Sequence, residues 1–85
     1  MEDRMAALRQ RFVDRCRDDL AALEQGDGPE RTIEIVHRLS GSAGIFGFSR
    51  ISEVAEQTET ALRDGTPNEE LMARLLDALR AVQRV

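Results

Sequence analysis

The 85-residue chain has no tryptophan or tyrosine, a single cysteine, and no apolar run near the roughly 20 residues that span a bilayer. Without Trp or Tyr, an aromatic platform for nucleic-acid bases is not expected. The net charge of −4 and the scattered basic residues also argue against binding a phosphate backbone. The first residues lack the cationic-then-apolar order of a signal peptide. We therefore expect a cytoplasmic protein that binds neither nucleic acid nor a membrane.

Cys16 has no second cysteine with which to form a disulfide within the chain. It lies on an apolar stripe with Phe12 and Leu20, which predicts a buried, reduced thiol; a reactive thiol is the less favoured alternative. Cys16 and His37 alone are too few ligands for a structural zinc site. The sequence thus predicts no metal site and no cofactor in this chain.

The length and ordinary composition predict one domain over residues 1–85. Apolar residues recur at spacings of three and four in four segments, about 3–25, 29–47, 50–64 and 67–84, which predicts four helices. Residues 32–36 favour a strand on propensity alone, but the helical spacing continues past them. Because short connections make neighbouring helices antiparallel, we expect an all-α, up-down-up-down four-helix bundle, present as a monomer.

The residues expected to face the core and those expected to end the helices follow from the same patterns. Gly26 suits a left-handed helix end, and Pro29 suits a first helical position. Ser49 is expected to cap the third helix, and Thr66 to form a capping box with Glu69, with Pro67 at the first helical position. The inward residues are Met5, Leu8, Phe12, Cys16, Leu20 and Leu23; Ile33, Val36, Leu39, Ala43 and Phe46; Ile51, Val54, Ala55, Thr58 and Leu62; and Leu71, Leu75, Leu79 and Val82.

His37 is the only histidine, and small residues surround it on the expected helix. Ser40 and Gly41 lie one turn along and Gly44 two turns along. A glycine in a helix interior costs roughly 1 kcal/mol relative to alanine, so two beside one imidazole indicate that a bulky group must approach the ring. The alternative is a histidine without a special role.

Glu59 is the residue expected to contact His37 from the next helix. His37 lies eleven residues before Phe48 and Glu59 eleven residues after it, so a hairpin that turns near Phe48 places them level. A carboxylate there can accept a hydrogen bond from imidazole Nδ1–H, which leaves Nε2 unprotonated and nucleophilic. The alternative is a solvated Glu59 that pairs with Arg63 four residues on.

Residues 37–48, His-Arg-Leu-Ser-Gly-Ser-Ala-Gly-Ile-Phe-Gly-Phe, resemble the active-site segment of histidine-containing phosphotransfer (HPt) domains, especially those of chemotaxis histidine kinases. The specific likeness covers about residues 29–65. It implies that His37 is phosphorylated and that Glu59 orients its imidazole. The family usually has lysine three residues after the histidine, where this chain has Ser40, which supplies a hydrogen bond but no charge. Arg38 or Arg63 could supply that charge, or Arg38 could be an exposed, solubilising residue.

The resemblance implies a phosphorelay intermediate, a phosphoryl carrier rather than an enzyme. His37 would exchange its phosphoryl group with the aspartate of a response-regulator receiver domain, which brings its own Mg²⁺, and a histidine kinase or hybrid kinase would be a further partner. The residues predicted to bind the partner are Arg38, Ser40, Gly41 and Gly44. Alternatives are a phosphorylation-independent module that inhibits a receiver or kinase, a purely structural bundle, and a glycine-rich nucleotide site, which the glycine spacing does not fit.

Overall fold

The computed structural model describes residues 2–66 and 68–84. Within them the backbone forms four α-helices: α1 (Glu2–Gln25), α2 (Pro29–Ile45), α3 (Ser49–Arg63) and α4 (Glu69–Val82). The prediction of an all-α fold is confirmed. Residues 32–36 lie within α2, so the strand alternative was wrong. None of these helices, over the residues described, is long and apolar enough to cross a membrane.

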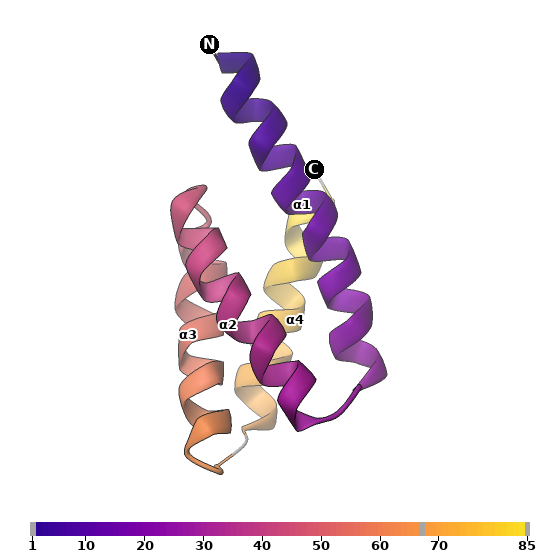
Figure 1. The fold of residues 1–85 in the computed structure, drawn as a ribbon, viewed down its shortest axis with the longest axis vertical. Helices are drawn as coiled ribbons and strands as arrows, with labels where there is room; N and C mark the ends of the chain where they lie inside the picture. Colours follow the sequence, from indigo (N-terminus) through magenta and orange to yellow (C-terminus); the bar gives the residue numbers. More distant parts are fainter. Residues whose placement is uncertain (1, 67, 85) are drawn as a thin grey trace.

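The chain reverses direction at each connection, so that successive helices run down, up, down and up (Figure 1). Contacts between α2 and α3 agree with this order: His37, in the middle of α2, meets Glu59, late in α3. Ser40, one turn later in α2, accepts a hydrogen bond on its carbonyl oxygen from Ser52, early in α3. The helices around the site therefore form an antiparallel hairpin.

The core lies along the line where the four helices meet. Its largest fully buried side chains are Ile35, Leu39, Leu75, Leu79, Val36 and Cys16. Ile35 was not on the predicted inner face of α2, whereas Ile33 was and is only half-buried. Because α2 packs against both α1 and α3, its buried face is wider than the single stripe that spacing suggested.

The beginning of α1 departs from the prediction. Met5 and Leu8 were expected to face the core, but their exposed fractions are 45% and 36%. With 24 residues α1 is roughly 36 Å long, whereas α4 has 14 residues and is roughly 21 Å long. The start of α1 consequently extends beyond the ends of the other helices (Figure 1).

Two helix ends are built differently from the prediction. α2 ends at Ile45, where the Phe48 N–H donates to the Ala43 carbonyl at 2.8 Å and Gly47 takes a φ of 82°, a Schellman end. Ser49 is already the first residue of α3, so its prediction as a cap was wrong.

The predicted capping box before α4 was also wrong. Asn68 is the cap, and its side-chain oxygen accepts hydrogen bonds from the backbone N–H groups of Glu70 and Leu71. Thr66 instead donates from its hydroxyl to the Ala61 carbonyl. The predicted role of Pro67 lies outside the described residues.

Candidate functional site

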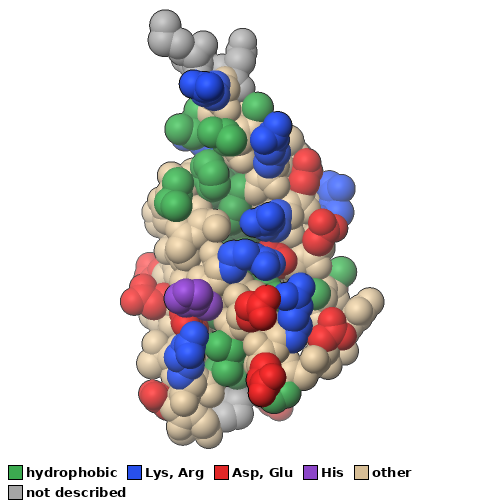
Figure 2. Space-filling model, viewed as in Figure 1, with side chains coloured by type: hydrophobic (Ala, Val, Ile, Leu, Met, Phe, Trp, Pro, Cys, Tyr) green, Lys and Arg blue, Asp and Glu red, His purple; other side chains and the backbone are tan. Residues whose placement is uncertain are grey.

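His37 stands on the surface of α2 with 68% of its side chain exposed. Its chain neighbour Val36 and nearby Leu39 are buried, with exposed fractions of 0% and 1%. Core packing therefore fixes the backbone that carries the imidazole while the ring projects into solvent. Figure 2 shows the histidine, in purple, with acidic and basic side chains beside it.

Glu59 on α3 holds one ring nitrogen of His37. The distance between Nδ1 of His37 and Oε2 of Glu59 is 2.8 Å, and only 14% of the Glu59 side chain is exposed. An ionised carboxylate can only accept, so the shared proton belongs to Nδ1. Nε2 is then the unprotonated nitrogen of the neutral ring, and it is the nitrogen available to an electrophile.

Arg63 contacts the same carboxylate oxygen from one turn further along α3. Its Nε donates to Oε2 of Glu59 at 2.7 Å. Desolvation raises the pKa of Glu59, but the hydrogen bonds and charges of Arg63 and His37 together lower it below its usual 4.5. Glu59 thus contacts both His37 and Arg63. The predicted pairing with Arg63 is present, but Glu59 is not the solvated residue of that alternative, because only 14% of its side chain is exposed.

Arg38 is neither a free cation beside the imidazole nor a fully solvated charge. Its Nη2 donates to Oδ1 of Asp19 at 2.6 Å, and Asp19 is only 4% exposed. Desolvation raises the pKa of Asp19, and Arg38 opposes that rise. Asp19 was not among the predicted site residues, although an acidic residue near the core positions Cys16 and Leu20 indicates that a basic partner lies opposite.

The small residues near His37 leave its surroundings open. A Cβ at Gly41 would meet nothing within 4 Å, and one at Gly44 would lie 3.4 Å from the Ser52 hydroxyl. The Ser40 hydroxyl donates to the His37 carbonyl at 2.8 Å. Packing among the described residues therefore gives no reason for glycine at position 41, one turn from the imidazole.

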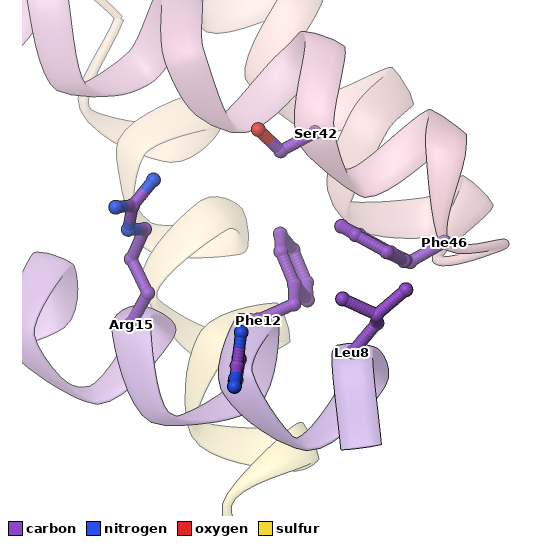
Figure 3. A pocket seen from close by; sticks show the side chains of 6 residues that line it. Leu8, Phe12, Arg15, Ser42 and Phe46 are labelled. Atoms are coloured by element: carbon purple, nitrogen blue, oxygen red, sulfur yellow. The ribbon is translucent and has the colours of Figure 1, made fainter. Parts of the chain in front are cut away.

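A shallow cavity of about 230 Å³ lies between α1 and α2. Leu8 and the rings of Phe12 and Phe46 gather at one end, with Arg15 and Ser42 at the other (Figure 3). The centroids of the two rings are 5.7 Å apart. Hydrophobic side chains also show on the histidine-bearing face of the molecule, over the N-terminal part of α1 (Figure 2). The same face thus carries an imidazole and an apolar area.

The remaining potential metal ligands and the cysteine thiol do not form a second site among the described residues. Across residues 2–66 and 68–84, no group of three or more His, Cys, Asp or Glu side chains is arranged to hold a metal ion. Cys16 is fully buried, as predicted, and burial, with the charge of Asp19, raises the pKa of its thiol to about 12. That thiol remains protonated and unreactive at neutral pH.

Comparison with known proteins identifies a family and a group of relatives. The profile of the Hpt domain family matches residues 7–85. The signal transduction histidine-protein kinase BarA, from Shigella flexneri and from Escherichia coli strain K12, is 31% identical over 74 residues, which are 87% of this chain but 8% of each kinase. The chain therefore spans a small part of these relatives. No solved structure gave a significant match.

The predicted closeness to chemotaxis kinases in particular stays a prediction, as do the roles of the individual site residues. The family itself is settled by a match that leaves out only the first six residues and by a helical fold with its one histidine at the surface. The chain belongs to the Hpt domain family, whose members are phosphoryl carriers of two-component signalling rather than catalysts.

Proposed function

We propose that the protein is a phosphorelay intermediate that accepts a phosphoryl group on Nε2 of His37 and exchanges it with the aspartate of a response-regulator receiver. The observation that carries the proposal is the 2.8 Å contact between Nδ1 of His37 and Glu59 on a ring that is otherwise exposed. It fixes the tautomer whose free nitrogen points away from the protein.

The transfer needs little from this chain beyond position. The lone pair of Nε2 forms the new P–N bond while the P–O bond of the aspartyl phosphate breaks, and its electron pair stays on the aspartate. The Nδ1 proton remains between the imidazole and Glu59, which stabilises the charge that the ring gains. Receiver aspartate and Mg²⁺ supply the rest of the electrostatic stabilisation, so the divalent cation belongs to the partner.

The receiver approaches across Gly41, where the helix surface has no side chain to keep the two backbones apart. The cavity between α1 and α2 continues this face, and its apolar end fits a hydrophobic side chain of the partner. Arg11 and Arg15 line the same cavity and suit an acidic rim. Docking therefore combines close backbone approach with charge complementarity.

Incubation with a radiolabelled, phosphorylated receiver tests the proposal. Phosphohistidine resists base but not acid, whereas aspartyl phosphate is lost in base, so the stability of the transferred label identifies the acceptor. We expect base-stable label on the wild-type chain and none on a folded His37→Ala variant.

Two other results would replace the proposal. Label of wild-type amount on His37→Ala would place the phosphoryl group elsewhere. Binding to the receiver without any transfer would favour a phosphorylation-independent inhibitory module. This is the second candidate function, because Ser40 stands where the family usually has lysine.

A further inference from the structure

All twelve basic residues of the chain are arginines, so no lysine is available to neutralise a phosphoryl group on His37. At the position where the family usually has lysine, the Ser40 hydroxyl is already directed to the His37 carbonyl at 2.8 Å. A phosphorylated imidazole carries roughly two negative charges. A cation for that group must come from a different position.

Two arginines lie close to His37 or to its carboxylate partner. Arg38 follows His37 in sequence, but its guanidinium is bound by the buried Asp19 toward α1. Moving it toward the imidazole would leave a buried carboxylate without its partner, which is costly. Arg38 therefore stays bound to Asp19 and does not reach the phosphoryl group.

Arg63 is placed differently. Its Nε shares Oε2 of Glu59 with Nδ1 of His37, at 2.7 Å and 2.8 Å, so the guanidinium and the imidazole contact the same carboxylate oxygen. Its side chain is 56% exposed, and the structure records no hydrogen bond from its Nη1 or Nη2 to another described residue. Both Nη groups can donate while Nε keeps Glu59 in place.

We propose that Arg63 binds the phosphoryl group of phosphorylated His37, and so replaces from α3 the cation that the family usually supplies from α2. Arg63 then has two contacts in the phosphorylated protein. Its Nε donates to the Glu59 carboxylate that accepts from Nδ1, and its Nη groups donate to the phosphoryl oxygens bonded to Nε2. The inference rests on the proposed phosphorylation of His37.

Phosphoramidate tests this without a receiver, because it donates its phosphoryl group to an imidazole with release of ammonia. The wild-type chain, Arg63→Gln and Arg63→Lys would be phosphorylated in this way, and the hydrolysis rate of each phosphohistidine measured at low and high salt. Arg74→Gln is the matched control, since Arg74 pairs with Glu70 at the same i,i+4 spacing and distance of 2.7 Å and is 54% exposed, on α4.

We expect Arg63→Gln to lose its phosphoryl group about two- to five-fold faster than wild type, the range for an exposed charge pair. Arg63→Lys should lie near wild type, Arg74→Gln should match it, and the difference should shrink at high salt. ³¹P NMR titration should show a higher pKa for the phosphoryl group in Arg63→Gln, a change that a merely structural role would not produce.

The Glu59→Gln background separates direct action from action through Glu59. The amide oxygen that this substitution introduces can still accept from Nδ1–H, so a persistent effect of Arg63→Gln there supports direct binding. Equal hydrolysis rates and equal phosphoryl pKa values in wild type and Arg63→Gln would overturn the inference while phosphorylation itself stands. A wild-type chain that takes no phosphoryl group from phosphoramidate or from the receiver would instead overturn the proposed function.

Discussion

Arg38 turns away from the histidine it follows and joins α2 to α1 through a 2.6 Å contact with the buried Asp19. Oδ2 of Asp19 and Nε of Arg38 are both buried without a hydrogen-bond partner, so the pair is only partly satisfied. Such a contact contributes little net stability when intact, but its loss leaves a buried charge alone.

Replacement of Arg38 by alanine should therefore destabilise the fold by about 1–3 kcal/mol at neutral pH. Urea unfolding measures the effect, with Arg31→Ala as the control, because Arg31 pairs with Glu34 on the surface. A loss no greater than that of the control would show that solvent already screens Asp19.

The pH dependence of the same variant has a defined sign. The pKa of Asp19 is raised above its usual 3.8 in the folded chain, so the folded state holds this proton more tightly than the unfolded state. Ionisation of Asp19 thus lowers the free energy of unfolding as pH rises from 3.8 through the raised pKa. Loss of Arg38 raises the pKa of Asp19 further, so the cost of Arg38→Ala should shrink as pH falls from this higher pKa of the variant toward the raised pKa of the wild type, because a protonated carboxyl needs no cation.

Loss of Glu59 should slow phosphorylation of His37. Glu59→Ala removes the acceptor that fixes the tautomer, and we expect phosphoramidate to label it about 2- to 10-fold more slowly than wild type. Glu59→Gln, which keeps an acceptor oxygen, should lose less. Equal rates in all three would mean that the imidazole needs no orientation.

Ionisation of Glu59 changes the free energy of unfolding in the opposite direction to ionisation of Asp19. Its pKa is lowered from 4.5 in the folded chain, so its contribution is present above pH 4.5 and is lost as pH falls through the lowered pKa. Acid unfolding of Glu59→Gln should accordingly be less steep in that range than that of the wild type.

Substitutions at Gly41 should separate helix stability from docking. Since a Cβ there meets nothing within 4 Å, Gly41→Ala should raise stability by up to about 1 kcal/mol. Gly41→Leu should keep the helix but weaken receiver binding in calorimetry, whereas Ala73→Leu, on the exposed surface of α4, should not. Unchanged affinity in Gly41→Leu would move the docking surface elsewhere.

Ser40→Lys should increase the share of phosphorylated His37 at equilibrium with a phosphorylated receiver. The added charge on a half-buried, solvent-accessible position is worth about two- to five-fold at low salt and less at high salt. The gain should be larger in the Arg63→Gln background, where the lysine supplies the missing cation. A smaller phosphohistidine share in Ser40→Lys would show that the longer side chain obstructs the receiver.

The end of α4 that carries the cap offers a test of the fold. Asn68→Ala should cost about 1 kcal/mol, because two backbone N–H groups lose their acceptor. Thr66→Ala removes only a 3.3 Å hydrogen bond at the surface and should change the free energy of unfolding by less than about 0.5 kcal/mol. A larger loss of stability in Thr66→Ala than in Asn68→Ala would favour the capping box predicted from the sequence.

Features set by chain order and spacing could be predicted from the sequence. The position of Glu59 opposite His37 was predicted from their equal separation from Phe48, because an antiparallel helical hairpin with a short connection has a nearly fixed register. Gly26 and Pro29 were also predicted correctly, since backbone φ alone decides their places: Gly26 has a φ of 69° and Pro29 begins α2.

Features decided by competition between neighbours could not be predicted. Thr66 and Asn68 are both residue types that cap helices well, and α4 begins after the second of them. The exposure of Met5 depends on where the other helices stop, which periodicity does not report. The direction of Arg38 depends on Asp19 in another helix, and no spacing within α2 encodes that contact.

The connection between α2 and α3 has a consequence for the timing of the chemistry. Residues 46–48 alone separate the two helices, so closing this hairpin costs little chain entropy. The carboxylate and the imidazole are consequently brought together once, when the protein folds, and not again in each round of transfer. A receiver meets an acceptor whose orientation is already set, and the encounter has only its own docking entropy to overcome.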